Sequence, residues 1–152
     1  MSMYPPDVLD DPGDDDGTMP TNVALFERQV VGRRIVAVEG ASGTGTSRYG
    51  YERPLNGTKI ILDDGTSVFL ADTDECCAHT SVTRFLLHPE RVDHVITGVA
   101  TTGGFEKWHV YADLGDILEL DVMWSCGNPF YYGYGFDIYV QRGAAEPVEV
   151  EG

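Results

Sequence analysis

The strongest constraint on the fold is a run of alternating apolar and polar residues at positions 117–124. The even positions are apolar: Leu118, Leu120, Val122 and Trp124. Three of the odd positions hold two acidic residues and a methionine: Glu119, Asp121 and Met123. Successive side chains of a strand point to opposite faces, so this period of two predicts a strand with one buried and one wetter face. A similar alternation at 135–141 predicts a second such strand.

Further strands are expected at 35–38, 92–100 and 106–113. The strand at 106–113 is joined to its neighbours by two short connections, Thr102-Gly103-Gly104 before it and Leu114-Gly115-Asp116 after it. Glycine-containing connections of this length are typical of hairpins, so the strands are expected to pair antiparallel.

The dipeptide Asp64-Gly65 lies between strand candidates at 59–63 and 66–70 and is the strongest hairpin signal in the chain. If the turn has two residues, Ile61 faces Val68 and Ile60 faces Phe69 across the ladder.

A short helix is predicted at 23–30, capped by Thr21 or Asn22 and ended by Gly32. Its apolar residues share one face: Val23, Phe26 and Val30. The glycine- and serine-rich residues 41–56 predict a long mobile loop. The segment 78–87 fits either a helix or a strand, and its β-prone Ser81-Val82-Thr83 slightly favours the strand.

These patterns predict a mainly β (α+β) fold. We expect a single antiparallel, strongly twisted sheet or a partly open barrel, with one or two short helices. Residues 1–20 are expected to form a disordered acidic leader, 21–142 a single globular β-rich domain, and 143–152 a flexible acidic tail.

The net charge of −15 is concentrated at the two ends of the chain. Nine of the 25 acidic residues lie in the first 17 and the last seven positions, so residues 18–145 carry 16 acids against 10 basic residues, a net charge of −6. Direct binding to nucleic acid is not expected, because phosphate contacts require clustered Lys and Arg. No apolar run approaches the roughly 20 residues of a membrane span, and the N-terminal residues do not predict a secretory signal.

Cysteine and histidine are the first candidates for chemistry. Cys76, Cys77 and His79 offer zinc ligands, and four residues could complete the set: Cys126, His88, His94 and His109. Adjacent cysteines point to opposite sides of an extended chain, whereas zinc ligands are normally two to four residues apart, so packing of these thiols is favoured over a metal site. A cysteine nucleophile with His79, His94 or His109 as its base is disfavoured, because Asp74 and Glu75 raise a nearby thiol pKa.

Five carboxylates are expected to approach one another if the last strands pair: Asp113, Asp116, Glu119, Asp121 and Asp137. Such a group could hold calcium or act as an acid–base pair. A solvated face is the favoured interpretation, because Glu119 and Asp121 lie on the polar side of an alternating strand.

The most unusual stretch is the aromatic and glycine-rich segment 129–136. Its candidate partner-binding residues are Phe130, Tyr131, Tyr132 and Tyr134. Exposed tyrosines supply contact area with few rotatable bonds and are enriched at interfaces. The alternative is a bulged strand whose aromatic residues cover the edge of the core.

Six strings between about residues 30 and 140 carry a family resemblance: VVGRRIVAVE, LDDGTSVFL, DECCA, LHPERVDHVITGV, WHVYADLGDILELDVMW and YYGYGFDI. In these strings the chain resembles an uncharacterised family of domains of unknown function that is common in actinobacteriophage genomes and found in some actinobacteria. The resemblance implies a phage or actinobacterial origin and action in the host cytoplasm, and it implies no activity.

No group of residues forms a catalytic signature, so the sequence favours a non-enzymatic accessory protein. We expect it to bind a host or phage protein through the aromatic loop and a sheet edge. One alternative is a metal-binding protein that uses Cys76, Cys77 and His79, with zinc as its ion; otherwise no cofactor is expected. A further alternative is an acidic DNA mimic that inhibits a host defence or regulatory protein.

Overall fold

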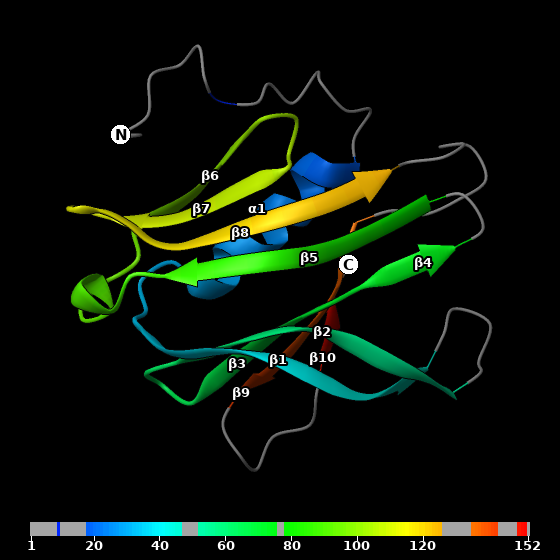
Figure 1. The fold of residues 1–152 in the computed structure, drawn as a ribbon. Helices are drawn as coiled ribbons and strands as arrows, with labels where there is room; N and C mark the ends of the chain where they lie inside the picture. The colour runs from blue at the N-terminus through cyan, green and yellow to red at the C-terminus, as the bar shows by residue number, and fades with distance from the viewer. Residues whose placement is uncertain are drawn as a thin grey trace.

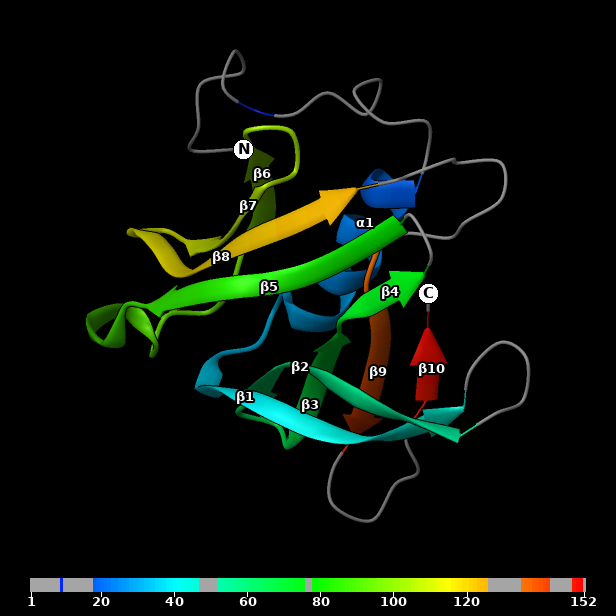
Figure 2. The same ribbon diagram turned by 45° about the vertical axis from the view of Figure 1, so that its right-hand side comes forward.

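The described part of the chain folds into two antiparallel five-stranded sheets and one α-helix (Figures 1 and 2). The computed structural model defines residues 9, 18–46, 52–75, 78–125, 135–142 and 149–151. None of the helices in these ranges has the length and apolar character needed to cross a bilayer. The predicted mainly β character and antiparallel pairing are confirmed.

Helix α1, Thr18–Val30, confirms the helix expected at 23–30 and begins five residues earlier. Its core-facing stripe includes Met19, Phe26 and Val30, all completely buried. Gly32 follows with a φ of 86°, a left-handed conformation that glycine adopts without strain.

The predicted cap at Thr21 or Asn22 is wrong, because both residues lie inside the helix. Asn22 instead bonds to the segment before β9. Its side-chain nitrogen donates to the Phe136 carbonyl at 2.9 Å, and the Phe136 N–H donates to Asn22 Oδ1 at 3.0 Å. The amide therefore satisfies two buried backbone groups far away in sequence.

The first sheet, sheet A, has the strand order β4-β5-β8-β7-β6. Its strands are β4 Thr73–Glu75, β5 Ala78–Leu87, β6 Gly98–Thr102, β7 Lys107–Ala112 and β8 Gly115–Ser125. The slight preference for a strand at 78–87 is confirmed by β5. The strand expected at 92–100 begins only at Gly98, because the chain first makes the short 3-10 helix η2, Pro89–Arg91, and a turn.

The second sheet, sheet B, has the order β1-β2-β3-β9-β10. Its strands are β1 Ile35–Thr46, β2 Glu52–Leu62, β3 Thr66–Ala71, β9 Asp137–Arg142 and β10 Glu149–Glu151. Strand β9 confirms the strand expected at 135–141. Strand β10 lies within the segment expected to be a flexible tail and pairs with β9.

The expectation of a single sheet or partly open barrel is wrong. Strands β3 and β4 are consecutive but belong to different sheets, with only Asp72 between them. The Asp72 N–H bonds to the Asn56 carbonyl at 2.7 Å, which holds the chain where it leaves sheet B. The two sheets diverge from this point, as Figure 2 shows.

The hairpin at Asp64-Gly65 is confirmed, but its predicted register is wrong by one residue. Ile60 pairs with Val68, and Ile61 pairs with Ser67. The loop has three residues, 63–65, and ends at Gly65 in a left-handed conformation with a φ of 88°. This three-residue loop is a common alternative to the two-residue turn, and it shifts every following pair.

The long loop expected at 41–56 is also wrong in its described part. Strands β1 and β2 form paired arms that extend to Thr46 and Glu52. Ser42, Gly43 and Thr44 are exposed. Because these positions face no core, backbone pairing alone determines their conformation, and low strand propensity does not prevent it.

The core lies between the two sheets and α1, where Trp108 is its largest buried side chain. The ring of Trp108 lies 5.9 Å from that of Phe26 on α1 and 5.3 Å, edge-on, from that of Phe136. Its indole N–H donates to the Phe105 carbonyl at 3.0 Å. Truncation of such a side chain typically costs about 3–5 kcal/mol, so packing around Trp108 contributes strongly to stability. These contacts all lie on the inner face of sheet A.

Candidate functional site

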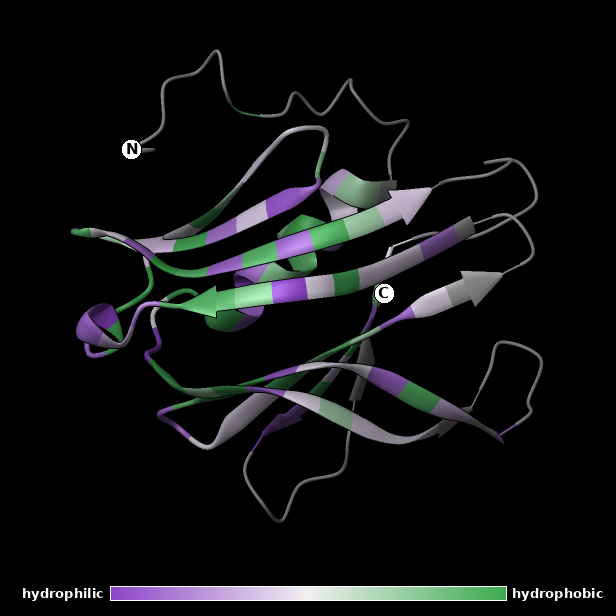
Figure 3. Cartoon of the chain, in the orientation of Figure 1, coloured by the Kyte–Doolittle hydropathy of each residue, from purple (hydrophilic) through white to green (hydrophobic). Residues whose placement is uncertain are grey.

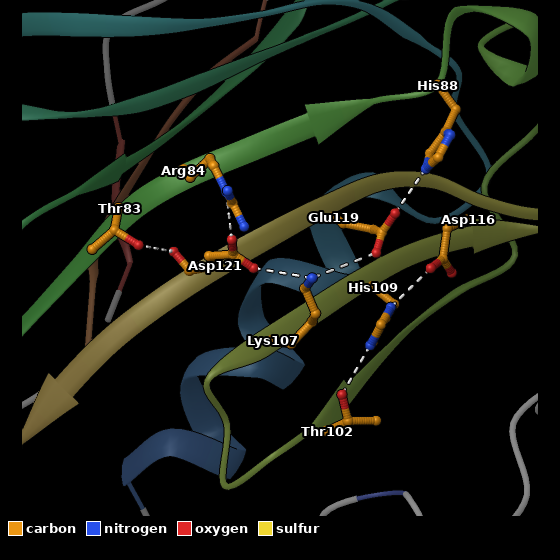
Figure 4. Close-up of polar contacts among 9 residues, drawn as sticks. All are labelled: Thr83, Arg84, His88, Thr102, Lys107, His109, Asp116, Glu119 and Asp121. Atoms are coloured by element: carbon orange, nitrogen blue, oxygen red, sulfur yellow. Dashed lines mark hydrogen bonds and ion pairs between the residues drawn. The ribbon is translucent and has the colours of Figure 1, made fainter.

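Polar side chains gather on the outer face of sheet A, where β5, β7 and β8 lie side by side (Figure 4). We call the following eight residues the outer-face cluster: Arg84, His88, Thr102, Lys107, His109, Asp116, Glu119 and Asp121. The cluster follows from strand alternation, because Trp108 and Leu120 point into the core while their neighbours point outward. The register places Lys107 opposite Asp121 and His109 opposite Glu119.

A β-bulge at Ile117 places Asp116 in this cluster. Val110 pairs with Leu118, whereas the next residue, Tyr111, pairs with Asp116, so Ile117 is an extra residue in β8. Ile117 is fully buried. The inserted residue reverses the alternation beyond it and turns the Asp116 side chain to the same face as His109.

Both ring nitrogens of His109 are engaged. Nδ1 lies 2.8 Å from Asp116 Oδ2, and Nε2 lies 3.0 Å from Thr102 Oγ1. An ionised carboxylate only accepts, so Nδ1–H donates to Asp116 and the Thr102 hydroxyl donates to Nε2. Only 10% of the His109 side chain and 16% of the Asp116 side chain are exposed.

The Asp116 carboxyl is held in an unfavourable environment for its charge. Burial, followed by the nearby negative charge of Glu119, raises its pKa to about 6. Its second oxygen, Oδ1, is buried and has no hydrogen-bond partner among the described residues. Buried carboxylate oxygens are normally paired, so this one has unused capacity for a ligand.

Glu119 connects two parts of the cluster. His88 Nε2 lies 2.8 Å from its Oε2, and Lys107 Nζ lies 3.7 Å from its Oε1. Partial burial raises the pKa of Glu119, but the His88 hydrogen bond and the Lys107 charge outweigh burial and lower it overall. The side chain is 20% exposed.

Asp121 receives two cations. Arg84 Nε lies 2.9 Å from one of its oxygens and Lys107 Nζ lies 3.1 Å from the other. Slight burial raises the pKa of Asp121, but the hydrogen bonds from Lys107 and Arg84 lower it overall. This part of the face is therefore locally balanced in charge.

A pocket of about 290 Å³ lies beside these ion pairs. It is lined by two cationic, two anionic and two apolar side chains: Arg84, Lys107, Glu119, Asp121, Phe85 and Leu86. A ligand here would meet both charge signs and an apolar wall.

Thr102, His109 and Asp116 stand in the order hydroxyl, imidazole, carboxylate, which can polarise a hydroxyl group. Thr102 does not line the pocket, however. A ligand held in the pocket would contact the ion pairs rather than this hydroxyl. The arrangement therefore supports ligand binding better than acyl transfer.

Most of the site residues predicted from the sequence lie outside the described residues. This holds for two of the three zinc ligands and for the whole aromatic set: Cys76, Cys77, Phe130, Tyr131, Tyr132 and Tyr134. His79 lies on β5 opposite Ser125 and does not belong to the three-residue group of possible metal ligands found among the described residues. These assignments stay predictions.

The histidines and carboxylates considered separately in the sequence are partly brought together. His88 and His109 join Asp116, Glu119 and Asp121. The other two predicted carboxylates lie elsewhere, since Asp113 pairs with His94 at 2.9 Å and Asp137 lies on β9 of sheet B. The solvated face favoured by the sequence does not describe Asp116 and Glu119, which are mostly buried.

Three cluster members were not identified as functional candidates from the sequence: Arg84, Thr102 and Lys107. Lys107 carried a usable signal. The hairpin predicted between 106–113 and 117–124 places outward residues of the two strands on one face, and this pairing could have identified Lys107 and His109 as neighbours of the acidic residues of β8.

The chain matches the family model described as Domain of unknown function (DUF7448) over residues 28–138. It belongs to this family. The span of the DUF7448 match contains the complete outer-face cluster and begins near the end of α1. No curated protein and no solved structure matches the chain.

Proposed function

We propose that this DUF7448 protein is a non-enzymatic phage accessory protein that binds a host or phage protein. The observation that supports this proposal is an exposed apolar surface around the pocket on the outer face of sheet A. Leu86 on β5 is 54% exposed and Met123 on the adjacent β8 is 52% exposed. Figure 3 colours the C-terminal end of β5 as hydrophobic.

Apolar and charged side chains alternate along this face, so it offers two kinds of contact to a protein partner. The Arg84–Asp121 ion pair lies on the face between the pairs Leu86–Glu119 and Ser81–Met123. Apolar contacts contribute affinity, and complementary charges fix the register of the partner. The face offers both.

The pocket is at the lower end of the size range of ligand sites, which is typically about 300–1,000 Å³. At about 290 Å³, with two exposed apolar residues beside it, this pocket fits one or two side chains of a partner. The partner surface would then continue over Leu86 and Met123.

The aromatic set of Phe130, Tyr131, Tyr132 and Tyr134 extends the proposed surface in sequence. It follows β8 by a few residues, and β8 carries Met123. We propose that both contribute to the partner site. The resemblance to actinobacteriophage domains supports a role in the host cytoplasm.

DNA mimicry gains no support from this face. A mimic presents uncompensated negative charges at the spacing of phosphates. Here Arg84 and Lys107 neutralise Asp121.

Affinity capture from actinobacterial lysate, with and without phage infection, tests the proposal. We expect one protein to be enriched by the wild type and lost with the double variant Leu86→Ser/Met123→Ser. The matched control is Val36→Ser, which removes an exposed apolar residue from β1 of sheet B. Equal capture by the double variant and the wild type would refute the proposed surface.

A second variant tests the aromatic part. Replacement of Tyr131, Tyr132 and Tyr134 by Ala should lower capture of the same protein, with an unchanged unfolding transition as the check on folding. Undiminished capture would remove the aromatic segment from the proposed surface.

A further inference from the structure

We propose that His109, Asp116 and Glu119 form a site for a divalent transition-metal ion such as zinc. Each residue offers one ligand atom, and these atoms lie within 4.8 Å of one another. The site uses neither cysteine and goes beyond the proposed partner binding. Three protein ligands with a remaining open position are typical of zinc sites that hold water or an exogenous ligand.

The geometry needs only a small contraction to hold an ion. At bond lengths of about 2.0–2.2 Å, tetrahedral ligand atoms lie about 3.4 Å apart. His109 on β7 pairs with Glu119 on β8, and the bulge at Ile117 places Asp116 beside them. Side-chain rotations would have to close the remaining gap, and the backbone already places all three side chains on one face.

The electrostatics favour a cation. Asp116 and Glu119 place two carboxylates next to each other in a mostly buried setting, where their mutual repulsion is costly. The buried Asp116 Oδ1 has no hydrogen-bond partner among the described residues. An ion between the two carboxylates would reduce the repulsion and give Asp116 Oδ1 a partner.

Two further residues are placed to support the ligands. His88 holds Glu119 through Oε2 at 2.8 Å, so an ion would bind Oε1, in competition with Lys107 Nζ at 3.7 Å. In the ion-bound protein His109 Nδ1 holds the ion, and the ring proton resides on Nε2. Nε2–H then donates to Thr102 Oγ1, the atom to which it is already paired at 3.0 Å. Such outer hydrogen bonds orient metal-bound histidines.

The donor set indicates the class of ion. One imidazole nitrogen and two carboxylate oxygens suit zinc, cobalt or manganese. Calcium prefers six to eight oxygen ligands, and magnesium usually retains several waters. Imidazole at the centre of the set therefore favours a transition metal.

Lys107 provides a sharp test, because its ammonium competes with the ion. Its Nζ lies 3.7 Å from Glu119 Oε1 and 3.1 Å from Asp121. Replacement by methionine keeps much of the apolar stem and removes the positive charge. The variant Lys107→Met should bind zinc several-fold more tightly than the wild type.

The experiment is calorimetric titration of tag-free protein with zinc chloride after chelator treatment, in a Cys76→Ser/Cys77→Ser background. We expect one ion per chain, at least tenfold weaker binding in Asp116→Asn and Glu119→Gln, and unchanged binding in Asp113→Asn. The last variant is the matched control, since Asp113 pairs with an imidazole but lies outside the site. Thermal unfolding with and without zinc provides a second readout. Zinc should raise the unfolding temperature of each protein that binds it in the calorimeter and leave that of the weakly binding variants unchanged.

Two results would overturn the site. One is a cysteine-free protein that binds no zinc, which would assign any binding by the wild type to the thiols. The other is equal affinity in the wild type, Asp116→Asn and Glu119→Gln. Neither result bears on partner capture, so failure of the metal site and failure of the proposed function are distinguishable.

Discussion

His109 Nδ1 lies 2.8 Å from Asp116 Oδ2, although alternation in an unbroken hairpin would put these side chains on opposite faces of sheet A. The extra residue Ile117 removes that conflict by shifting the register between them. The bulge also moves a carboxyl into a mostly buried position beside Glu119, which raises its pKa to about 6. One inserted residue thus creates the largest upward pKa shift among the described carboxyl groups.

Asp116→Asn should stabilise the metal-free protein above about pH 6. The folded-state pKa of about 6 exceeds the ordinary value of 3.8, so the folded protein binds this proton more tightly than the unfolded chain does. Wild-type stability is therefore lost as the pH rises through this window, and asparagine avoids the loss. We expect a gain of about 1–2 kcal/mol at pH 8, reduced by partial solvent contact.

Urea unfolding in the presence of a chelator at pH 4 and pH 8 measures this difference. The gain should shrink towards zero at pH 4, where the aspartic acid is largely protonated. Asp113→Asn, at an exposed carboxyl, serves as the control. A variant that is less stable than the wild type at pH 8 would contradict the environment described for Asp116.

Gly57→Ala should destabilise sheet B strongly. A Cβ at this position would lie 2.0 Å from the Leu70 carbonyl oxygen on β3, so the backbone of β2 or β3 must shift. We expect a loss of at least about 2 kcal/mol in the free energy of unfolding. Gly40→Ala on β1 is the matched control, since its Cβ would meet no atom within 4 Å and its effect should stay within about 0.5 kcal/mol. Equal effects of the two substitutions would show that β2 and β3 are not packed this closely.

Asn22→Ala should weaken the attachment of α1 to the segment before β9. The substitution leaves the Phe136 N–H and carbonyl without their side-chain partner in a buried position. We expect a loss of about 2–3 kcal/mol, measured by chemical denaturation. Arg28→Ala, at an exposed position of the same helix, should change stability by less than about 0.5 kcal/mol. The interaction has no role in stability if both variants unfold at the wild-type midpoint.

The elements with strict alternation could be predicted from the sequence. In β8 the even residues Leu118 and Leu120 are buried, and Glu119 points outward. This follows because successive side chains of a strand point to opposite faces of the sheet. Alternation also predicted that acidic side chains of β8 would share a face. It could not place Asp116, since a bulge breaks the period locally.

The division into two sheets depends on interactions that a local pattern does not contain. Nothing in the residues around Asp72 marks the point at which the chain leaves one sheet for the other, because both strands continue the same extended conformation. The long pairing of β1 with β2 could not be predicted from the local sequence either. Glycine and serine disfavour strands on average, and only pairing with the opposite arm stabilises them there.

The most direct test of the proposed function is site-specific photo-crosslinking in infected host cells. A photoreactive phenylalanine analogue introduced at position 86 lies on the proposed surface, and the same analogue at position 36 lies on the exposed face of β1. We predict a single protein adduct from position 86 that is absent from position 36. The absence of an adduct at position 86, or the same adduct from both positions, would contradict a partner site on the outer face of sheet A.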